Sequence, residues 1–185
     1  LMAQHLPHPA RAATLDIAVY HTSLSRAGPG LLLRDILRGK NAQVQAVTEI
    51  IAHAAPDILL LLDIDFDHDL LALKALRDKI GALRPNSGMA TGLDLDRDGR
   101  HGGPRDAQGY GHFSGQGGMA ILSRHPIRSD AVQDHSALLW RDLPGAMLSL
   151  PNGTALLTPE VLALQRLSQR GHWVVPFVVD GLDIW

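Results

Sequence analysis

The sequence predicts an α/β fold, in which strands lie buried between layers of helices. Residues 15–20 (LDIAVY) alternate apolar and other residues, as a strand with one buried face does. Residues 58–62 (ILLLL) form a short, continuously apolar run, which favours a strand covered on both faces. Between these runs, apolar residues recur at helical spacing: Val44, Val47, Ile51 and Ala54. This alternation of strand and helix is typical of an α/β protein.

Local signals place the other helices of the first half. Residues 31–39 (LLLRDILRG) favour a short helix, and Asn41 is a suitable N-cap for the next helix, which Pro56 ends. Asp67 or Asp69 is expected to cap a third helix. The residues on one face of that helix are apolar, and a glycine follows as a stop signal: Leu70, Leu73, Leu76, Ile80 and Gly81.

The second half begins with an irregular segment. Residues 84–118 are rich in Gly, Asp, Pro and Asn and show no periodic apolar face, so we expect a long loop. Loops of that length are uncommon unless they are functional, held by a metal, or disordered. Strand character resumes at 119–122 (MAIL), and 136–140 (SALLW) is another candidate strand.

The C-terminal part carries further turn, helix and strand signals. Asn152-Gly153 indicates a hairpin turn. Thr158 followed by Pro159 predicts a helix start, and we expect that helix to end at Gly171. Residues 172–179 (HWVVPFVV) predict a strand, which its proline assigns to an edge or a bulge.

Composition limits the class of protein. The chain has 185 residues, enough for one domain with a substantial core. Its net charge of -2 provides no strong attraction to nucleic acid or to an anionic membrane. It has no cysteine, so disulfides and thiolate metal sites are excluded, and no apolar run is long enough for a membrane-spanning helix.

The first residues are expected to be a leader rather than part of the fold. Residues 1–13 lack the apolar core of a signal peptide, and we expect them to be disordered. Their Ala-Arg-Ala-Ala end is also compatible with a cleavage region, which would favour an extracytoplasmic compartment. The remaining residues, 14–185, form the expected domain.

A row of acidic residues follows the strand at 58–62: Asp63, Asp65, Asp67 and Asp69. In an extended chain this spacing places all four carboxylates on one face. Open α/β sheets bind ligands at the carboxyl ends of their strands, and carboxylates suit Mg²⁺, Mn²⁺ or Ca²⁺. In the alternative interpretation Asp67 and Asp69 cap the next helix, while Asp63 and Asp65 are solvated.

The long loop contains the first half of a calcium-loop pattern. Positions 1, 3 and 5 are aspartates and position 6 is glycine: Asp94, Asp96, Asp98 and Gly99. The carbonyl of Arg100 is available at position 7. Position 12 is Arg105 rather than Glu, so this is no EF-hand, but Asp106 is placed to complete a Ca²⁺ site. The alternative is a flexible acidic turn.

Four stretches together resemble the endonuclease/exonuclease/phosphatase superfamily: IAVYHTSLSR, NAQVQAVTEIIAHAAPDILLLLDIDFD, RPNSGMATGLDLDRDGRHGGPRDAQGYG and GQGGMAILSRHPI. The match spans most of residues 15–145, and the third stretch is similar to a bacterial subgroup. The resemblance implies two β-sheets packed as a sandwich and flanked by helices. It also implies hydrolysis of a phosphoester substrate with Mg²⁺ or Mn²⁺.

The resemblance also implies site residues. His21 stands where the family has an Asn at the end of the first strand. Asp63 stands at the family's metal-binding Glu, with Asp65 as its neighbour in the same site. The family's later Gly-Asp-x-Asn and Ser-Asp-His motifs are not found, so we expect a partial, truncated domain. The alternative is a non-catalytic fragment stabilised by calcium, and an exposed sheet would favour self-association.

Overall fold

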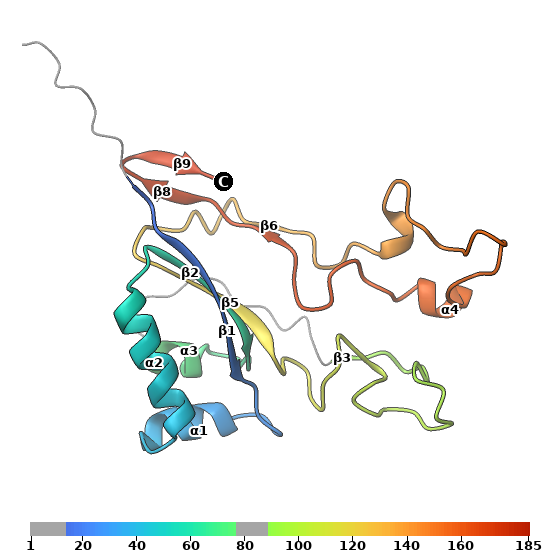
Figure 1. Cartoon of the computed structure of the whole chain (residues 1–185), viewed down its shortest axis with the longest axis horizontal. Helices are drawn as coiled ribbons and strands as arrows, with labels where there is room; N and C mark the ends of the chain where they lie inside the picture. The colour runs from blue at the N-terminus through green and yellow to red at the C-terminus, as the bar shows by residue number, and fades with distance from the viewer. Residues whose placement is uncertain (1–13, 77–88) are drawn as a thin grey trace, which may run out of the picture.

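A computed structural model describes residues 14–76 and 89–185, and its centre is a three-stranded sheet (Figure 1). The strands are β1 (Ile17–Leu24), β2 (Ile58–Ile64) and β5 (Gly118–Ser123), in the order β1-β2-β5. β1 pairs with β2 in parallel, and β5 pairs with β2 in the antiparallel direction. The three strand predictions are confirmed, and β2 is the buried central strand.

Three helices cover one face of this sheet: α1 (Leu31–Arg38), α2 (Ala42–Ala54) and α3 (Leu71–Leu76). Figure 1 shows them gathered on the same side of the strands. Their apolar residues share one buried cluster with the strands, including Leu32, Val47, Leu61, Leu73 and Ala120. The predicted amphipathic helix is therefore confirmed as one layer of the core.

The predicted cap of α2 is also confirmed. The side-chain oxygen of Asn41 accepts a hydrogen bond from the backbone N–H of Val44 at 3.1 Å. In addition, its amide nitrogen lies 3.4 Å from the Asp35 carboxylate of α1. One side chain therefore begins α2 and ties it to the preceding helix.

A small ribbon covers part of the opposite face. It consists of β8 (Phe177–Val179) and β9 (Leu182–Ile184), which are antiparallel. Phe177 and Val179 pack with Ile58 and Ile121 of the central sheet in a second buried cluster. The fold is therefore mixed α/β, as predicted, and its second sheet layer is two-stranded.

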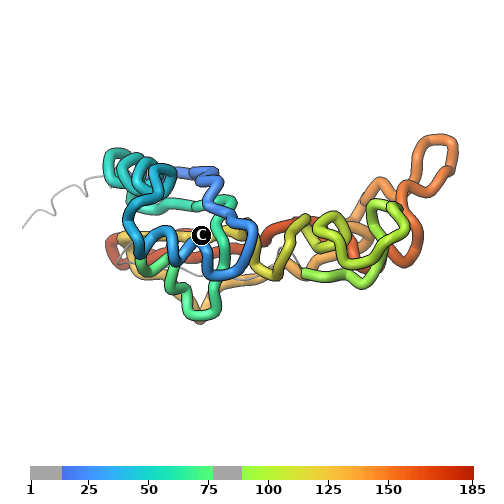
Figure 2. Tube along the Cα trace, turned by 90° about the horizontal axis from the view of Figure 1, so that it is seen from below, coloured from blue at the N-terminus to red at the C-terminus, as the bar shows by residue number. Residues whose placement is uncertain are grey.

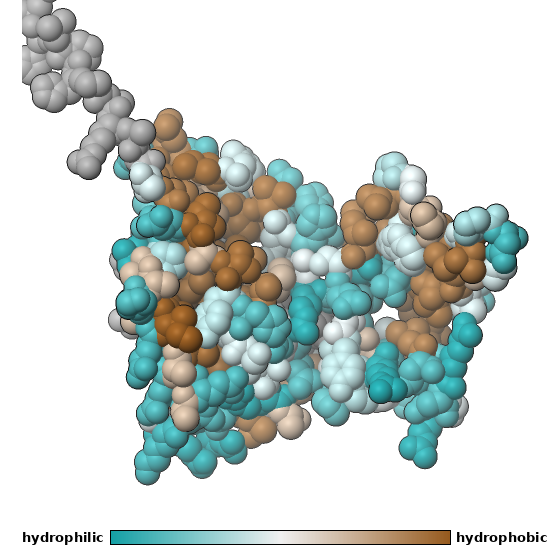
Figure 3. Space-filling model, in the orientation of Figure 1, coloured by the Kyte–Doolittle hydropathy of each residue, from teal (hydrophilic) through white to brown (hydrophobic). Residues whose placement is uncertain are grey.

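On β1, the face opposite the helices remains exposed. Ile17 and Val19 each keep 65% of their surface accessible, and Figure 3 shows apolar surface in the region of β1 and the C-terminal ribbon. Self-association through this face stays a prediction.

The remaining elements form an arm beside the sheet (Figures 1 and 2). The Gly/Asp-rich loop contains a short antiparallel pair, β3 (Met89–Ala90) with β4 (Ala107–Gln108). The C-terminal half of the arm contains β6 (Gln133–Asp134), paired with β7 (Trp173–Val174). A short 3-10 helix and α4 complete the arm, at Trp140–Asp142 and Pro159–Leu162.

Two predictions in this arm are wrong. Residues 136–140 form a turn and the start of the 3-10 helix instead of a strand, and α4 ends at Leu162 instead of Gly171. The backbone N–H of Trp140 donates to the carbonyl of Gln165, and the N–H of Leu167 donates to that of Leu138. The two segments therefore meet at an isolated antiparallel bridge between Leu139 and Arg166, and no ladder extends from it within the described residues.

Other expectations of the C-terminal half are confirmed in outline. Asn152-Gly153 forms a turn, in which Leu150 N–H donates to the Thr154 carbonyl and Gly153 has a φ of 82°. Thr158 caps α4 by accepting from Val161 N–H. The predicted strand at 172–179 is divided into β7 and β8 around Pro176, which has no N–H to donate.

Some expectations lie outside the described residues, namely the leader at 1–13 and the helix positions Ile80 and Gly81. Within the described ranges, no helix has the length and apolar character that a membrane crossing requires.

Candidate active site at the end of the central strand

A bulge places Asp63 at the carboxyl end of β2. Between Leu62 and Ile64 the register of β2 shifts in its pairing with β1 and in its pairing with β5, and Asp63 has a φ of 59°. The hydroxyl of Thr22 donates to the carbonyls of Leu62 and Asp63, at 3.0 and 3.1 Å. Because one β1 side chain satisfies both carbonyls, the bulge is held in place although its backbone is left-handed at a non-glycine residue.

Asp65 is a buried connector between three segments. Only 5% of its surface is exposed. One carboxylate oxygen accepts from the backbone N–H of Arg26 at 2.8 Å, and the other accepts from the N–H of Gly117 at 3.0 Å. Burial raises the pKa of Asp65 above its ordinary value, although the two amide donors and the Arg26 charge act in the opposite direction. Asp65 therefore joins the loop after β1 and the start of β5 to the end of β2.

The last two aspartates of the row have other positions. Both carboxylate oxygens of Asp67 accept from backbone N–H groups at the start of α3, those of Leu71 and Ala72. Asp69 is exposed and lies 3.3 Å from the ring of His68. The idea that all four carboxylates share one face is thus wrong, because β2 ends at Ile64. The alternative role for Asp67, as a helix cap, is confirmed.

Arg170 completes the surroundings of Asp63, and sequence reasoning missed it. Its Nη1 lies 3.4 Å from Asp63 Oδ1, and it also donates to the backbone carbonyl of Gly117. A Cβ at Gly117 would lie 2.5 Å from Arg170 Nη1 and 2.6 Å from Asp63 Oδ1. Glycine at this position therefore makes the approach possible. Arg170 follows Asp63 by 107 residues, and no spacing or motif links the two.

His21 lies on the neighbouring strand. It pairs with Leu62 in the β1–β2 register, one residue before Asp63. Its side chain is exposed, and Nδ1 lies 3.3 Å from the hydroxyl of Ser23. The parallel pairing thus brings the ends of β1 and β2, with the two predicted catalytic residues, to one edge of the sheet.

A second acidic cluster lies in the arm. Carboxylate oxygens of Asp94, Asp96 and Asp106 all lie within 4.8 Å of one another. Asp98 does not belong to this group, and its carboxylate accepts from the N–H of Arg100 at 2.8 Å. Three of the predicted calcium ligands are thus brought together.

Backbone amides already support these carboxylates. Asp94 accepts from Asp98 and Gly99, at 3.1 and 2.9 Å. The buried Asp106 accepts from Leu95 and Gly103, at 2.7 and 3.0 Å. Burial tends to raise the pKa of Asp106, but backbone hydrogen bonds from Leu95, Gly103, Asp96 and Gly102 together outweigh burial and hold that pKa below its ordinary value.

Comparison with known families completes this description. The model of the Endonuclease/Exonuclease/phosphatase family matches residues 13–176. The chain belongs to this family. Comparisons with curated proteins and with solved structures gave no match. Endonuclease/exonuclease/phosphatase proteins are phosphoester hydrolases that generally use divalent metals.

The residues at the end of β2 suit the family's metal at one carboxylate. Asp63 Oδ1 faces Arg170, whereas Oδ2 has no recorded hydrogen bond within the described residues. A carboxylate oxygen is the ligand that Mg²⁺ and Mn²⁺ prefer. Asp65 lies beside it, but its two oxygens already accept the amides of Arg26 and Gly117. The donor set of the described residues therefore centres on Asp63.

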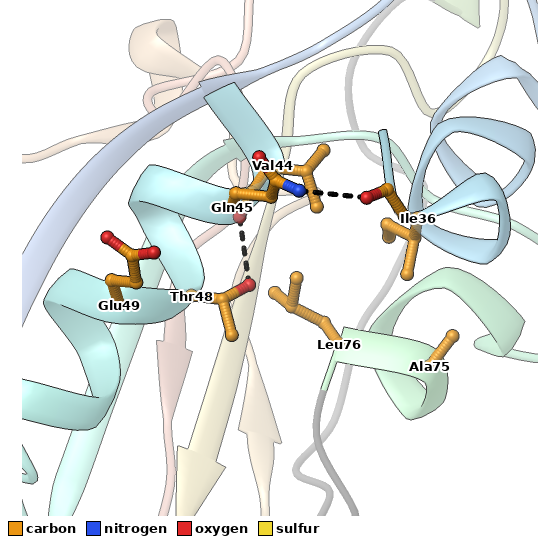
Figure 4. Close-up of a pocket in the computed structure, with 8 residues that line it drawn as sticks. Ile36, Val44, Gln45, Thr48, Glu49, Ala75 and Leu76 are labelled. Atoms are coloured by element: carbon orange, nitrogen blue, oxygen red, sulfur yellow. Dashed lines mark hydrogen bonds between the residues drawn. The ribbon is translucent and has the colours of Figure 1, made fainter. Parts of the chain in front are cut away.

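A pocket of about 320 Å³ on the helical side offers a poor alternative (Figure 4). Its lining is largely apolar, and two of its three polar side chains are already engaged, while the third is the single carboxylate Glu49. The hydroxyl of Thr48 donates to the Val44 carbonyl, and the amide of Gln45 donates to the Gly39 carbonyl, each at 2.8 Å. Since no set of charged groups converges on this pocket, it does not compete with the sheet edge as a catalytic site.

Proposed function

We propose that this chain is a divalent-metal-dependent phosphoester hydrolase whose site is built around Asp63. The observation that carries the proposal is the position of the Asp63 carboxylate at the joined ends of β1 and β2, in a chain of this family. A metal bound there, Mg²⁺ or Mn²⁺, would polarise the phosphoryl oxygen of the substrate.

In this proposal each residue has a separate task. Asp63 supplies the carboxylate ligand for the metal. Asp65 holds the loop after β1 and the segment before β5 in place through its hydrogen bonds to Arg26 and Gly117. It lies in the same site as a second carboxylate. The exposed imidazole of His21 accepts a proton from the attacking water, which is the task that histidine most often performs in hydrolysis. The substrate is a phosphoester, and its identity is left open.

Hydrolysis of bis(p-nitrophenyl) phosphate with Mg²⁺ or Mn²⁺ tests the proposal. Asp63→Ala should abolish turnover. His21→Ala should lower kcat by about 10²- to 10⁴-fold, as expected for a lost general base. Asp69→Ala is the matched control, because Asp69 is an exposed aspartate of the same segment, and it should retain activity.

Two results would contradict the proposal. One is a folded wild-type chain that shows no turnover with either metal. The other is turnover that survives in Asp63→Ala, because the reaction would then be catalysed elsewhere.

A second candidate role is favoured by the cluster in the arm. The carboxylates of Asp94, Asp96 and Asp106 would hold Ca²⁺, which stabilises the Gly/Asp-rich loop without taking part in catalysis. The carbonyl of Arg100 and the side chain of Asp98 are the further ligands predicted from the loop pattern. In this alternative the chain is a calcium-stabilised domain.

Thermal unfolding with and without Ca²⁺ tests this role. Ca²⁺ should raise Tm in the wild type and in an Asp130→Asn control, whose carboxylate is 75% exposed. The Asp94→Asn variant should lose the increase. Equal increases in Asp94→Asn and wild type would show that Ca²⁺ binds elsewhere.

A further inference from the structure

The guanidinium of Arg170 already occupies the position of a cation at Asp63. Its Nη1 lies 3.4 Å from Asp63 Oδ1, and the same nitrogen donates to the Gly117 carbonyl. The Asp63 side chain is only 15% exposed, whereas that of Arg170 is 37% exposed. Arg170 therefore lies on the solvent side of a carboxylate that is otherwise largely enclosed.

The backbone around Arg170 supports this contact. The Ser168 hydroxyl donates to the carbonyl of Gly171 and accepts from the N–H of the same residue. The Ser168 side chain therefore closes the turn that carries Arg170. Directly after it, β7 pairs with β6. Because the turn is held on both sides, Arg170 can leave Asp63 by rotating its side chain while the backbone stays in place.

A guanidinium and a divalent cation compete at one carboxylate, because the Arg170 guanidinium faces Oδ1 of Asp63 and a cation on Oδ2 would lie close to it. Both carry positive charge, and both would lie within about 4 Å of the same oxygens, where like charges repel strongly in a partly buried site. Space beside Oδ1 is restricted as well, since a Cβ on Gly117 would lie 2.5 Å from Arg170 Nη1 and 2.6 Å from Asp63 Oδ1. Binding of one cation therefore weakens binding of the other.

We propose that Arg170 is an internal counter-ion of Asp63, which a divalent cation must displace to bind there. The inference rests on the proposed metal site at Asp63. Arg170 is then a positioning residue, which neutralises and orients the Asp63 carboxylate in the metal-free protein. Only molecules in which Arg170 has left Asp63 can bind the metal, so the apparent metal affinity falls in proportion to their fraction.

Titration of the whole chain with Mn²⁺, followed by electron paramagnetic resonance of the free ion, tests the proposal. Arg170→Gln should bind Mn²⁺ about two- to fivefold more tightly than wild type, the range expected when a partly exposed ion pair is removed. Arg170→Lys, which keeps the charge but loses the planar fork, should lie between the two. Arg166→Gln removes the same charge four residues earlier and should match wild type.

The same titrations in an Asp63→Asn background identify the site that responds. There the effect of Arg170→Gln should disappear. If Asp63→Asn weakens Mn²⁺ binding but Arg170→Gln leaves it unchanged, the metal site stands and the competition is wrong. If Asp63→Asn changes Mn²⁺ binding in neither background, the proposed metal site fails, and the competition fails with it.

A second measurement needs no substitution. Phenylglyoxal modifies accessible arginines, and mass spectrometry maps the modified position. Saturation with Mn²⁺ should raise the modification rate of Arg170 in the wild type and leave that of Arg141, which is exposed, unchanged. An unchanged rate at Arg170, with Mn²⁺ bound at Asp63, would overturn the proposal.

Discussion

The carboxylate of Asp65 accepts a hydrogen bond from the backbone N–H of Gly117, 52 residues further along the chain, at 3.0 Å. Its second oxygen accepts from the N–H of Arg26 at 2.8 Å. One buried side chain therefore joins the segments that follow β1 and β2 to the segment that precedes β5. The geometry of the candidate site depends on this junction, because Asp63 and Gly117 are fixed relative to each other by it.

Asp65→Asn should destabilise the protein by about 1 to 3 kcal/mol. Asparagine has one acceptor oxygen, so one of the two buried N–H groups would lose its partner. Urea denaturation measures the change. Asp69→Asn makes the same chemical substitution at an exposed position and should cost less than about 0.5 kcal/mol. Similar costs at both positions would contradict a structural role for Asp65.

Gly117→Ala should be more destabilising than Gly153→Ala by at least about 1 kcal/mol. Both glycines have positive φ, 59° and 82°, so both substitutions introduce backbone strain. Only at Gly117 would the new Cβ meet neighbours, namely Asp63 and Arg170, whereas nothing lies within 4 Å at Gly153. Chemical denaturation of the two variants separates crowding from strain. Equal costs would show that Arg170 does not pack against Gly117.

Leu61→Ala should cost about 2 to 5 kcal/mol, because Leu61 is fully buried in the central strand. Val19→Ala, on the neighbouring strand, should change stability by less than about 0.5 kcal/mol, since Val19 is 65% exposed. The measurement is the free energy of unfolding in urea. A large loss in Val19→Ala would mean that this face of β1 is covered in solution.

The contribution of Asp106 should be lost in acid. Its pKa in the folded protein lies below the ordinary value of 3.8, so its ionised form stabilises the folded state above that value. This stability disappears as the pH falls through the folded pKa. The advantage of the wild type over Asp106→Asn, measured by denaturation, should therefore be greatest near neutral pH and should shrink below pH 3.8.

Asp35 provides a parallel in the same experiment. Hydrogen bonds from Arg26 and Arg34 hold its pKa below the ordinary value as well, so Asp106→Asn should retain some acid sensitivity. An advantage of wild type over Asp106→Asn that stays constant with pH would contradict the assignment for Asp106.

Much of the core was predictable because its signals are local. The apolar run of β2, the helical spacing of Val44 and Val47, and the cap at Asn41 each depend on neighbours within a few residues. Asp67 was predictable as a cap for the same reason. In contrast, the predicted strand at 136–140 was wrong, because Leu139 forms an isolated bridge with Arg166 instead of a regular ladder, which the apolar run alone does not reveal.

The features of the candidate site also fall into two groups: those that a local pattern predicts and those that only the fold brings together. The amino-acid order alone predicts that acidic residues follow the central strand and that aspartates cluster in the Gly/Asp-rich loop. Their contacts follow from the three-dimensional fold: Asp65 connects loops, Asp63 faces Arg170, and Asp106 joins Asp94 and Asp96. Separation along the chain explains the difference. Asp63 and Arg170 are 107 residues apart, so only the folded path of the backbone brings carboxylate and guanidinium together.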